Sequence, residues 1–235
     1  MAQTASPTLT CLIPAYNEGA RIPAVLAALH GHPLIDEVLV IDDGSHDDTV
    51  AQAERALSQL PRGRLLRQTQ NGGKTRALAR GLAEARGSHV LLLDADLTGL
   101  TPAHLTRLIA PVLSGAADLS VSLRDNAPWI WRVIGLDYIS GERVLRRDLI
   151  LPELNALDTL PKFGFEVFLN RLVLASGARI AVVRWHGVKS PLKGAKYGLW
   201  QGIRGDFGML RDMARTVPVW RLLGQILRLR ARRIA

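Results

Sequence analysis

The stretch "LLLDADLTG", residues 91 to 99, joins an apolar run to two aspartates one residue apart, Asp94 and Asp96. The preceding residues, Val90 to Leu93, are typical of a strand that is buried on both faces. The packing of a buried strand in the core does not explain two carboxylates at its end. The pair therefore either caps the next helix or holds something positive at the carboxyl edge of a sheet.

Patterns typical of strands and helices alternate along the first part of the chain. The predicted strands are 8–14, 36–44, 63–68 and 88–96, and the predicted helices are 20–30, 47–60 and 73–86. Strands separated by helices imply right-handed crossovers and a mainly parallel sheet. The sequence therefore predicts an open α/β sandwich, a class that binds ligands at the carboxyl ends of its strands.

Polar clusters follow three of these strands: "IPAYNEG", "DDGSHDDT" and "DADLTG". Ser45 can cap the next helix, and Glu18 can favour the start of its helix through the dipole, which are the alternatives to a binding role. Asp42 and Asp43 lie too far before the next helix to cap it. A carboxylate there suits the N–H of a nucleobase or the hydroxyls of a ribose. We therefore expect a binding site at this edge of the sheet.

The sequence matches parts of two known motifs, the phosphate loop and the EF-hand calcium loop, but completes neither. "GKT" at 73–75 matches the end of a phosphate loop, but position 68 is Gln where that motif needs Gly. "DADLTG" begins like a calcium loop, but its twelfth position is Leu105 rather than Glu. A glycine pair and Lys74 at a helix start can still meet a diphosphate through backbone N–H groups and one point charge.

The motifs "IPAYNE", "VIDDGSHDDT", "GGKTRAL" and "LLLDAD", in this order and spacing, resemble the nucleotide-sugar half of a family 2 glycosyltransferase with the GT-A fold. The resemblance covers 8–98 and implies a Rossmann-like half that binds a UDP- or GDP-linked sugar, with Mg²⁺ or Mn²⁺. It also implies a GT-A domain over 1–190, with 99–190 as the acceptor half. Hard oxygen ligands suit such ions, which stabilise charge on the departing nucleotide.

The same resemblance assigns roles to individual residues. Those implied to bind the nucleotide sugar are Pro14, Ala15, Tyr16, Glu18, Asp42, Asp43, Ser45, Lys74 and Asp94. Lys74 would lie near the diphosphate, and Asp94 and Asp96 would hold the ribose and the metal, with Asp96 also catalytic.

The second half is less regular. "SGERVLRRDLILPEL" (140–154) is predicted to be a loop entering a helix, 161–174 a helix, and 178–191 a strand ending near His186. This order resembles, more loosely, glucosyl-3-phosphoglycerate synthases and polyprenyl-phosphate glycosyltransferases. That resemblance makes His186 a third metal ligand, the alternative being a surface histidine. It gives Glu166 a catalytic or sugar-binding role, the alternative being a helix N-terminal carboxylate.

Three arginines, Arg143, Arg146 and Arg147, lie within five residues. Either they form a solvated helix face, or they clamp the phosphate of an acceptor, which guanidinium geometry favours.

The net charge of +9 lies entirely in the last fifth of the chain. Residues 187–235 hold 11 basic residues against Asp206 and Asp212, and 11 − 2 = 9. A helical wheel over 219–234 places Arg221, Arg228 and Arg232 opposite an apolar half. That half contains Val219, Trp220, Leu222, Leu223, Ile226, Leu227, Leu229 and Ile234. The segment 191–235 is thus predicted to be a basic amphipathic helical tail that lies on an anionic membrane. The alternative is a helix that packs on its own domain or on a second copy of the chain.

Together these features predict a metal-dependent hexosyltransferase that acts on a phosphate-bearing acceptor, polyprenyl phosphate at the membrane face being preferred. The alternatives are a soluble transferase for a small acceptor such as 3-phosphoglycerate, and a nucleotidyltransferase. Nucleic acid is not an expected partner, because it leaves the aspartates unexplained and 5% aromatic residues offer few stacking platforms. With no secretory signal and a single cysteine, Cys11, placed in a core strand, we expect the cytoplasm, at the inner face of the cell membrane.

Overall fold

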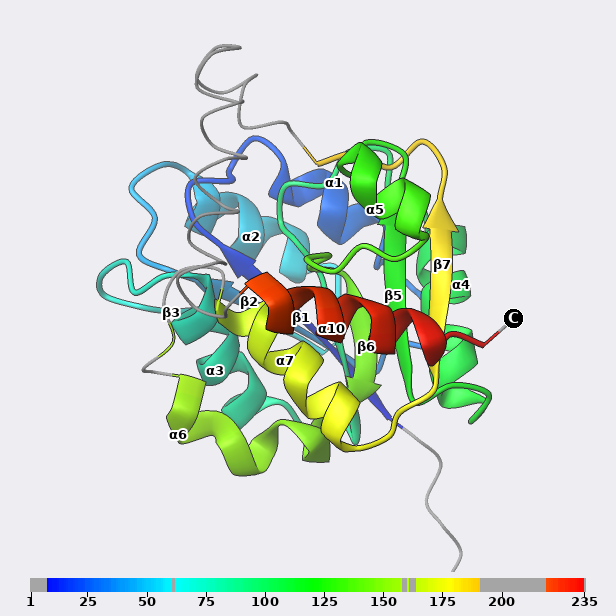
Figure 1. Ribbon diagram of the computed structural model, residues 1–235. Coiled ribbons are helices and arrows are strands. Elements are labelled where there is room, and N and C mark those ends of the chain that lie inside the picture. Colours follow the sequence, from blue (N-terminus) through cyan, green and yellow to red (C-terminus); the bar gives the residue numbers. More distant parts are fainter. Residues whose placement is uncertain (1–7, 61, 158–159, 161–163, 191–218, 235) are drawn as a thin grey trace, which may run out of the picture.

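The computed structural model describes residues 8–60, 62–157, 160, 164–190 and 219–234, with the backbone alone for 219–223. A seven-stranded sheet lies between two layers of helices (Figure 1). The strands are β1 (Leu9–Ala15), β2 (Glu37–Asp42), β3 (Gly63–Arg67), β4 (His89–Leu92), β5 (Leu119–Arg124), β6 (Arg143–Arg146) and β7 (Ile180–Trp185).

The helices surround this sheet on both faces (Figure 1). They are α1 (Ile22–Ala27), α2 (Thr49–Leu57), α3 (Lys74–Glu84), α4 (Pro102–Leu113), α5 (Trp129–Ile134), α6 (Leu154–Leu157), α7 (Gly164–Ala175) and α10 (Val219–Ala231). Two short 3₁₀ helices, η1 (Arg147–Leu149) and η2 (Leu151–Glu153), precede α6. None of the described helices is long and apolar enough to cross a membrane.

The strand order is β3-β2-β1-β4-β6-β5-β7, and β6 runs antiparallel to both of its neighbours. The pairs β1–β2, β1–β4, β2–β3 and β5–β7 are parallel. All strands except β6 therefore end at one edge of the sheet, the edge toward which β7 points in Figure 1. The prediction of an open, mainly parallel sheet with helices on both faces is confirmed.

The core has one apolar cluster on each face of the sheet. α1, α2 and α4 supply Ile22, Leu57 and Leu108 to one cluster. α3, α7 and α10 supply side chains such as Leu78 and Leu229 to the other. Cys11 is fully buried on β1, and burial raises the pKa of its thiol, which fits the predicted small core residue.

The prediction of a loop entering a helix at 140–154 is wrong for Arg143–Arg146, which form β6. Val144 and Leu145 pair with β4 on one side and β5 on the other, and both are fully buried. Helix propensity is a weak preference that tertiary pairing overrides. The gap between two parallel strands thus decides the conformation of this segment.

The C-terminal helix α10 packs on the domain rather than standing free. Ile226 and Leu229 are buried in the same cluster as α7, and Gln225 accepts a hydrogen bond from the Tyr138 hydroxyl at 2.6 Å. The expectation that these two apolar residues lie on a membrane is therefore wrong, because they face α7. Leu227 is 65% exposed. The side chains of 219–223 and the whole of 191–218 lie outside the described residues.

Candidate functional site

A pocket of about 230 Å³ lies at the carboxyl edge of the sheet, at the ends of β1, β2 and β4. It is lined by Pro14, Ala15, Tyr16, Glu18, Asp43, Lys74, Asp94, Ala95 and Asp96. The predicted residues on three separate loops thus come together because parallel strands end at the same edge.

The carboxylates of Asp42 and Asp43 hold the loops of the pocket. Asp43 accepts hydrogen bonds from the backbone N–H groups of Gly72 and Gly73, each at 2.8 Å. Gly73 has a φ of 90°, which glycine adopts without strain, and it ends the loop just before α3. Asp42 accepts from the N–H of Ser45 at 3.2 Å. Both carboxylates are therefore engaged in fixing the loops that carry the pocket wall.

Ser45 and Asp42 do not line the pocket. The hydroxyl oxygen of Ser45 accepts a hydrogen bond from the backbone N–H of Asn17 at 3.0 Å. This contact ties the loop after β2 to the loop after β1. Ser45 and Asp42 therefore fix the conformation of the loops around the pocket.

Lys74 lies between two carboxylates from distant parts of the chain. Its ammonium nitrogen is 2.7 Å from Asp94 Oδ1 and 3.3 Å from Glu166 Oε1. Burial opposes the charge on Lys74, yet these two acids raise its pKa above the ordinary value. The same contact lowers the pKa of Asp94 against the effect of its own burial. α7 thereby brings Glu166 to the pocket.

A buried polar network, which the sequence did not indicate, stands behind Asp94. Glu142 is fully buried and accepts hydrogen bonds from the hydroxyls of Ser122 and Ser140 at 2.6 and 2.8 Å. A guanidinium nitrogen of Arg124 lies 3.4 Å from Glu142. Burial would lower the pKa of Arg124, but the surrounding carboxylates, Glu142 and Asp94 first among them, raise it. Arg124 ends β5, so the carboxyl-edge rule that identified the aspartates could also have identified it.

Gly141 lets this network approach the pocket. A Cβ atom at this position would stand 2.5 Å from Asp94 Oδ1. Any side chain at 141 would displace the carboxylate, so the glycine is required by close approach.

Asp96 and His186 have different surroundings. The hydroxyl of Ser190 donates to Asp96 Oδ1 at 3.1 Å. His186 is 72% exposed at its side chain, and its Nδ1 lies 3.1 Å from Asp125 Oδ1. Among the residues that the structure describes, no group of three His, Cys, Asp or Glu side chains is placed to hold a metal. The predicted ligand set of Asp94, Asp96 and His186 therefore stays a prediction.

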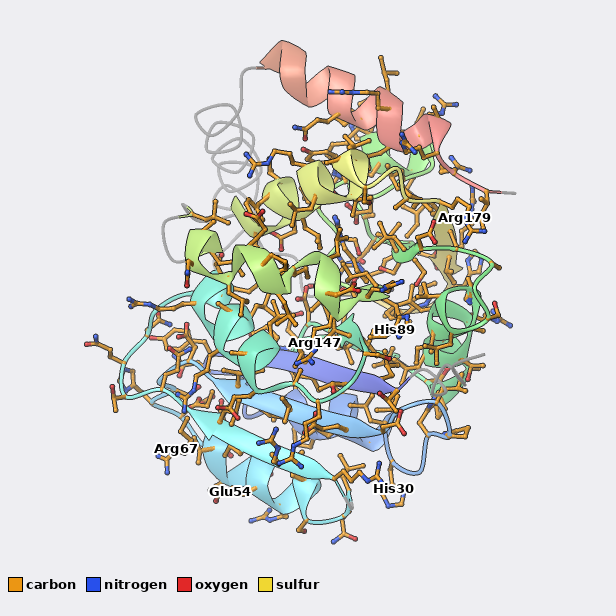
Figure 2. All side chains as sticks on the ribbon, turned by 90° about the horizontal axis from the view of Figure 1, so that it is seen from below. His30, Glu54, Arg67, His89, Arg147 and Arg179 are labelled. Atoms are coloured by element: carbon orange, nitrogen blue, oxygen red, sulfur yellow. The ribbon has the colours of Figure 1, made fainter. Side chains whose placement is uncertain are left out.

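The predicted cluster of three arginines does not form, because β6 is extended. Arg143 pairs with Leu92 near the carboxyl edge, whereas Arg146 pairs with His89 at the start of β4. Figure 2 looks onto the opposite edge and shows His89 and Arg147 there.

All three guanidinium groups already have partners. Arg143 is buried and donates to Asn170 Oδ1 at 2.6 Å. Arg146 pairs with Asp148, and Arg147 donates to the carbonyl oxygen of Ala85. The three arginines therefore do not form one phosphate clamp, and that prediction is wrong.

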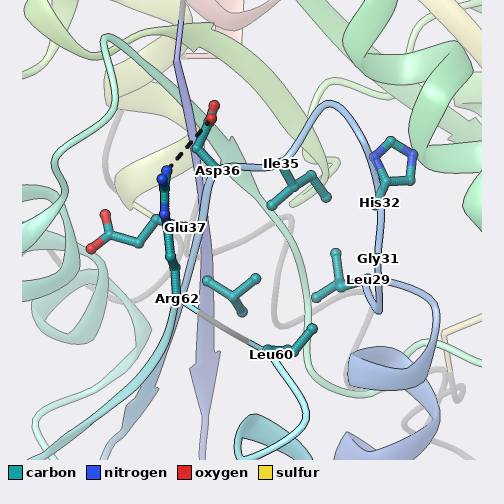
Figure 3. A pocket seen from close by; sticks show the side chains of 9 residues that line it. Leu29, Gly31, His32, Ile35, Asp36, Glu37, Leu60 and Arg62 are labelled. Carbon is teal, nitrogen blue, oxygen red and sulfur yellow. Dashed lines mark ion pairs between the residues drawn. The ribbon is translucent and has the colours of Figure 1, made fainter.

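Another cavity, of about 300 Å³, lies at the amino edge, around the start of β2 (Figure 3). Its rim carries the pair Asp36–Arg62 at 3.9 Å. The His32 imidazole is used for structure, with Nε2 3.0 Å from the Thr106 hydroxyl. Leu29, Ile35 and Leu60 make up much of the remaining wall. This cavity is far from the acidic strand ends, and its charged groups Asp36, Glu37 and Arg62 already have ionic partners.

Asp137 makes the polar network sensitive to pH. It is 1% exposed, and burial raises its pKa to about 6. A carboxyl whose pKa is higher in the folded state stabilises the fold below about pH 4, and this stability is lost as the pH rises to 6. We expect Asp137→Asn to gain stability relative to the wild type between pH 4 and 7. The gain is up to about 3 kcal/mol, measured by urea unfolding at both pH values.

The matched control is Asp118→Asn. Hydrogen bonds from Arg179 lower the pKa of Asp118, so its contribution is present above pH 4 and lost below it. Because this contribution is already present at pH 4, the variant should be less stable than the wild type by a nearly constant amount between pH 4 and 7. A wild-type-like pH profile for Asp137→Asn would contradict the assignment.

A family model described as "Glycosyl transferase family 2" matches residues 10–173, well over half of the chain. The chain belongs to this family. The resemblance drawn from its motifs is thereby confirmed, and the pocket coincides with the loops that carried those motifs.

Relatives in family 2 differ in their acceptors. The glucosyl-3-phosphoglycerate synthase of Mycobacterium tuberculosis is 33% identical over 126 residues, which cover 48% of this chain and 36% of that protein. The dolichol-phosphate mannosyltransferase of Pyrococcus furiosus is 26% identical over 204 residues, covering 74% of this chain and 55% of that protein. The chain thus spans about a third to a half of these relatives' lengths.

Solved structures of family 2 members share the fold. One is the Mycobacterium tuberculosis glucosyl-3-phosphoglycerate synthase in complex with Mn²⁺, uridine diphosphate and glucosyl-3-phosphoglycerate. It matches with a TM-score of 0.62 and 26% identity, and covers 87% of this chain and 80% of that chain. The GT-A architecture expected from the motifs is therefore confirmed.

Proposed function

We propose that this chain transfers a hexosyl group from a nucleoside-diphosphate sugar to a phosphate-bearing acceptor. The observation that carries the proposal is the pocket at the ends of β1, β2 and β4. Seven of the nine residues predicted to bind the nucleotide sugar line it, together with Asp96. Tyr16, 41% exposed at the pocket, offers a ring face, and Lys74 a positive charge at the start of α3.

The charges around the pocket suit a divalent cation. Five carboxylates and three cations beside the pocket interact with one another, and 5 − 3 leaves two negative charges in this group, which does not include Glu18 and Asp43 of the pocket wall. The carboxylates are Asp94, Asp96, Asp137, Glu142 and Glu166, and the cations are Lys74, Arg124 and Arg143.

Asp94 and Asp96 line the pocket and are the oxygen ligands that would hold Mg²⁺ or Mn²⁺. A bound ion of this kind supplies charge stabilisation to the departing diphosphate. A related family 2 structure contains Mn²⁺ with uridine diphosphate, which supports this choice.

Lys74 supplies the positive charge that a donor diphosphate would contact. In this structure it neutralises Asp94 and Glu166. A diphosphate entering the pocket competes for the same ammonium group, because a flexible lysine is a point charge that can be shared. Glu166, which would then lose its contact with Lys74, is the acid that we assign to the sugar. A phosphate acceptor is already an anionic nucleophile, so the transfer needs no general base to ionise it.

We take polyprenyl phosphate as the acceptor, at the inner face of the membrane. The dolichol-phosphate mannosyltransferase relative covers 74% of the chain, against 48% for the synthase relative. The second candidate is a small acceptor such as 3-phosphoglycerate, which the similarity to the solved synthase supports.

A transfer assay tests this function. The purified chain is incubated with Mn²⁺ and radiolabelled UDP-glucose, UDP-galactose or GDP-mannose, with undecaprenyl phosphate in detergent or with 3-phosphoglycerate. We expect label in the lipid product with one donor, and loss of that product in excess EDTA. Label only in the phosphoglycerate product would establish the second candidate. Binding of none of the nucleotides UDP, GDP and their sugars, measured by calorimetry with Mn²⁺, would overturn the transferase itself.

A further inference from the structure

Helix α5 presents three large apolar side chains to solvent. Trp129 is 69% exposed, Ile130 44% and Val133 73%. We call these three residues the α5 face. Over the described residues, only Tyr16 and Leu227 are other large hydrophobic side chains with such exposure. Among the residues that the structure describes, the exposed large apolar side chains are therefore concentrated on one short helix.

The helix beneath this face is firmly anchored. Trp131 is 3% exposed and stacks on Tyr138 with ring centroids 5.9 Å apart. Gly135 ends the helix in the left-handed conformation, and its N–H donates to the carbonyl oxygen of Trp131 at 2.8 Å. With about 3.6 residues per turn, burial of Trp131 directs the α5 face outward. The face thus belongs to a fixed helix and not to a loose loop.

The α5 face adjoins the site edge. α5 follows β5, which ends beside the pocket, and lies at the carboxyl edge of the sheet (Figure 1). Asn126, just before α5, donates to the carbonyl oxygen of Ser190 at 2.7 Å. The Ser190 hydroxyl in turn donates to Asp96. Two hydrogen bonds therefore connect the start of α5 to the pocket wall.

Exposed arginines lie on α5 and around the end of α10. Arg132 lies on α5 itself, α10 contributes Arg228 and Arg230, and Arg232 and Arg233 follow its last residue. Arg233 donates to the carbonyl oxygen of Ile134 at 3.4 Å, which places its guanidinium at the end of α5, whereas Arg232 donates to the carbonyl oxygen of Gly177 before β7. None of these five arginines has a carboxylate of the described residues within ion-pair distance. Their charges are thus available to an anionic partner.

We infer that the α5 face docks on an anionic lipid bilayer, with Trp129 at the interface and Arg132 and Arg233 among the headgroups. A Trp-bearing apolar surface beside basic side chains is the combination that interfacial segments use. Each basic residue near an anionic leaflet adds to binding. A stable dimer buries about 800 Å² on each partner, more than three side chains of a six-residue helix supply.

This inference deepens the proposed function, because docking here brings the pocket edge to a lipid-linked acceptor. It also relocates the membrane contact within the chain. The apolar residues Ile226 and Leu229, which the sequence offered for this contact, are used in the core.

Vesicle binding tests the inference without any nucleotide sugar, so its outcome is independent of the transfer assay. The full chain is sedimented with vesicles of phosphatidylcholine alone or with 30% phosphatidylglycerol, at low and at high salt. We expect binding to the anionic vesicles that weakens with salt. The triple variant W129S/I130S/V133S should bind at least about tenfold more weakly while keeping the wild-type Tm, because all three side chains are exposed. Leu227→Ser, which removes an exposed apolar residue outside α5, should stay within about twofold of wild type.

A label reports the contact directly. The single cysteine, Cys11, is buried, so Val133→Cys provides a unique accessible thiol for an environment-sensitive dye. Its emission should shift to the blue on anionic vesicles. His30→Cys, exposed at the opposite edge of the sheet (Figure 2), should give no shift.

Three results would overturn the inference. One is absence of wild-type binding to anionic vesicles at low salt. Another is a triple variant that binds no more weakly than Leu227→Ser. The third is a dimer in vesicle-free buffer that the triple substitution converts to monomer, because the face would then be an interface between copies.

Discussion

Replacing Asp96 by asparagine should lower kcat/KM for sugar transfer at least about a hundredfold and leave the fold intact. A hundredfold loss corresponds to about 2.7 kcal/mol of transition-state stabilisation. The amide keeps the size of the carboxylate and one oxygen acceptor for the Ser190 hydroxyl. It removes the negative charge that the pocket offers to a divalent cation.

The measurement is steady-state transfer with Mn²⁺, together with Tm from thermal unfolding. Asp118→Asn is the matched control, because Asp118 pairs with Arg179 outside the pocket and should leave kcat/KM unchanged. Mn²⁺ titration in the presence of UDP gives a second readout, in which Asp96→Asn should bind Mn²⁺ more weakly. Wild-type activity in Asp96→Asn would remove this residue from the mechanism.

Truncating Glu142 to alanine should lower the free energy of unfolding by about 3 to 5 kcal/mol at pH 7. Glu142 is fully buried, and Arg124, which it faces at 3.4 Å, is only 13% exposed at its side chain. Removal of one partner leaves a buried charge without its neighbour, which costs more than the pair contributes. The hydroxyls of Ser122 and Ser140 also lose their common acceptor.

Two further variants separate charge from hydrogen bonding, with urea unfolding as the measurement. Glu142→Gln keeps the shape and an oxygen acceptor but removes the charge. Its free energy of unfolding should therefore fall by more than half of the decrease expected for Glu142→Ala. Ser122→Ala removes one neutral hydrogen bond and should cost about 1 kcal/mol. If Glu142→Gln is as stable as the wild type, Arg124 is balanced by Asp94 and Asp137 instead, and the assigned pair is wrong.

The first half of the chain could be predicted closely, because its signals are local. Apolar runs ending in polar clusters mark β1, β2 and β4, and helical periodicity marks α2 and α3. A topological rule then brings the ends of parallel strands together without any knowledge of side-chain contacts. Asp43 and Asp94 were placed at one site on this basis, and the family resemblance added Lys74; all three line the pocket.

The second half depends on pairing between distant segments. Nothing local marks Arg143 to Arg146 as a strand, since the segment becomes β6 only by filling the space between β4 and β5. Its extended backbone separates Arg143 from Arg146 and so removes the predicted clamp. The pairing of Arg124 with Glu142 follows from the same insertion, and no spacing in the sequence relates the two.

The sequence by itself determined the class of the fold, the edge of the sheet that carries the site, and the acidic and basic groups that meet there. These follow from hydrophobic periodicity and strand order, which are properties of short segments. Tertiary structure alone decided which apolar surfaces remain exposed. A helical wheel shows that α10 has an apolar half, but a helix buries that half wherever a complementary surface exists, and α7 provides one for Ile226 and Leu229. On α5 the core accommodates Trp131, and Trp129, Ile130 and Val133 are left outside because six residues of helix have only one side to bury.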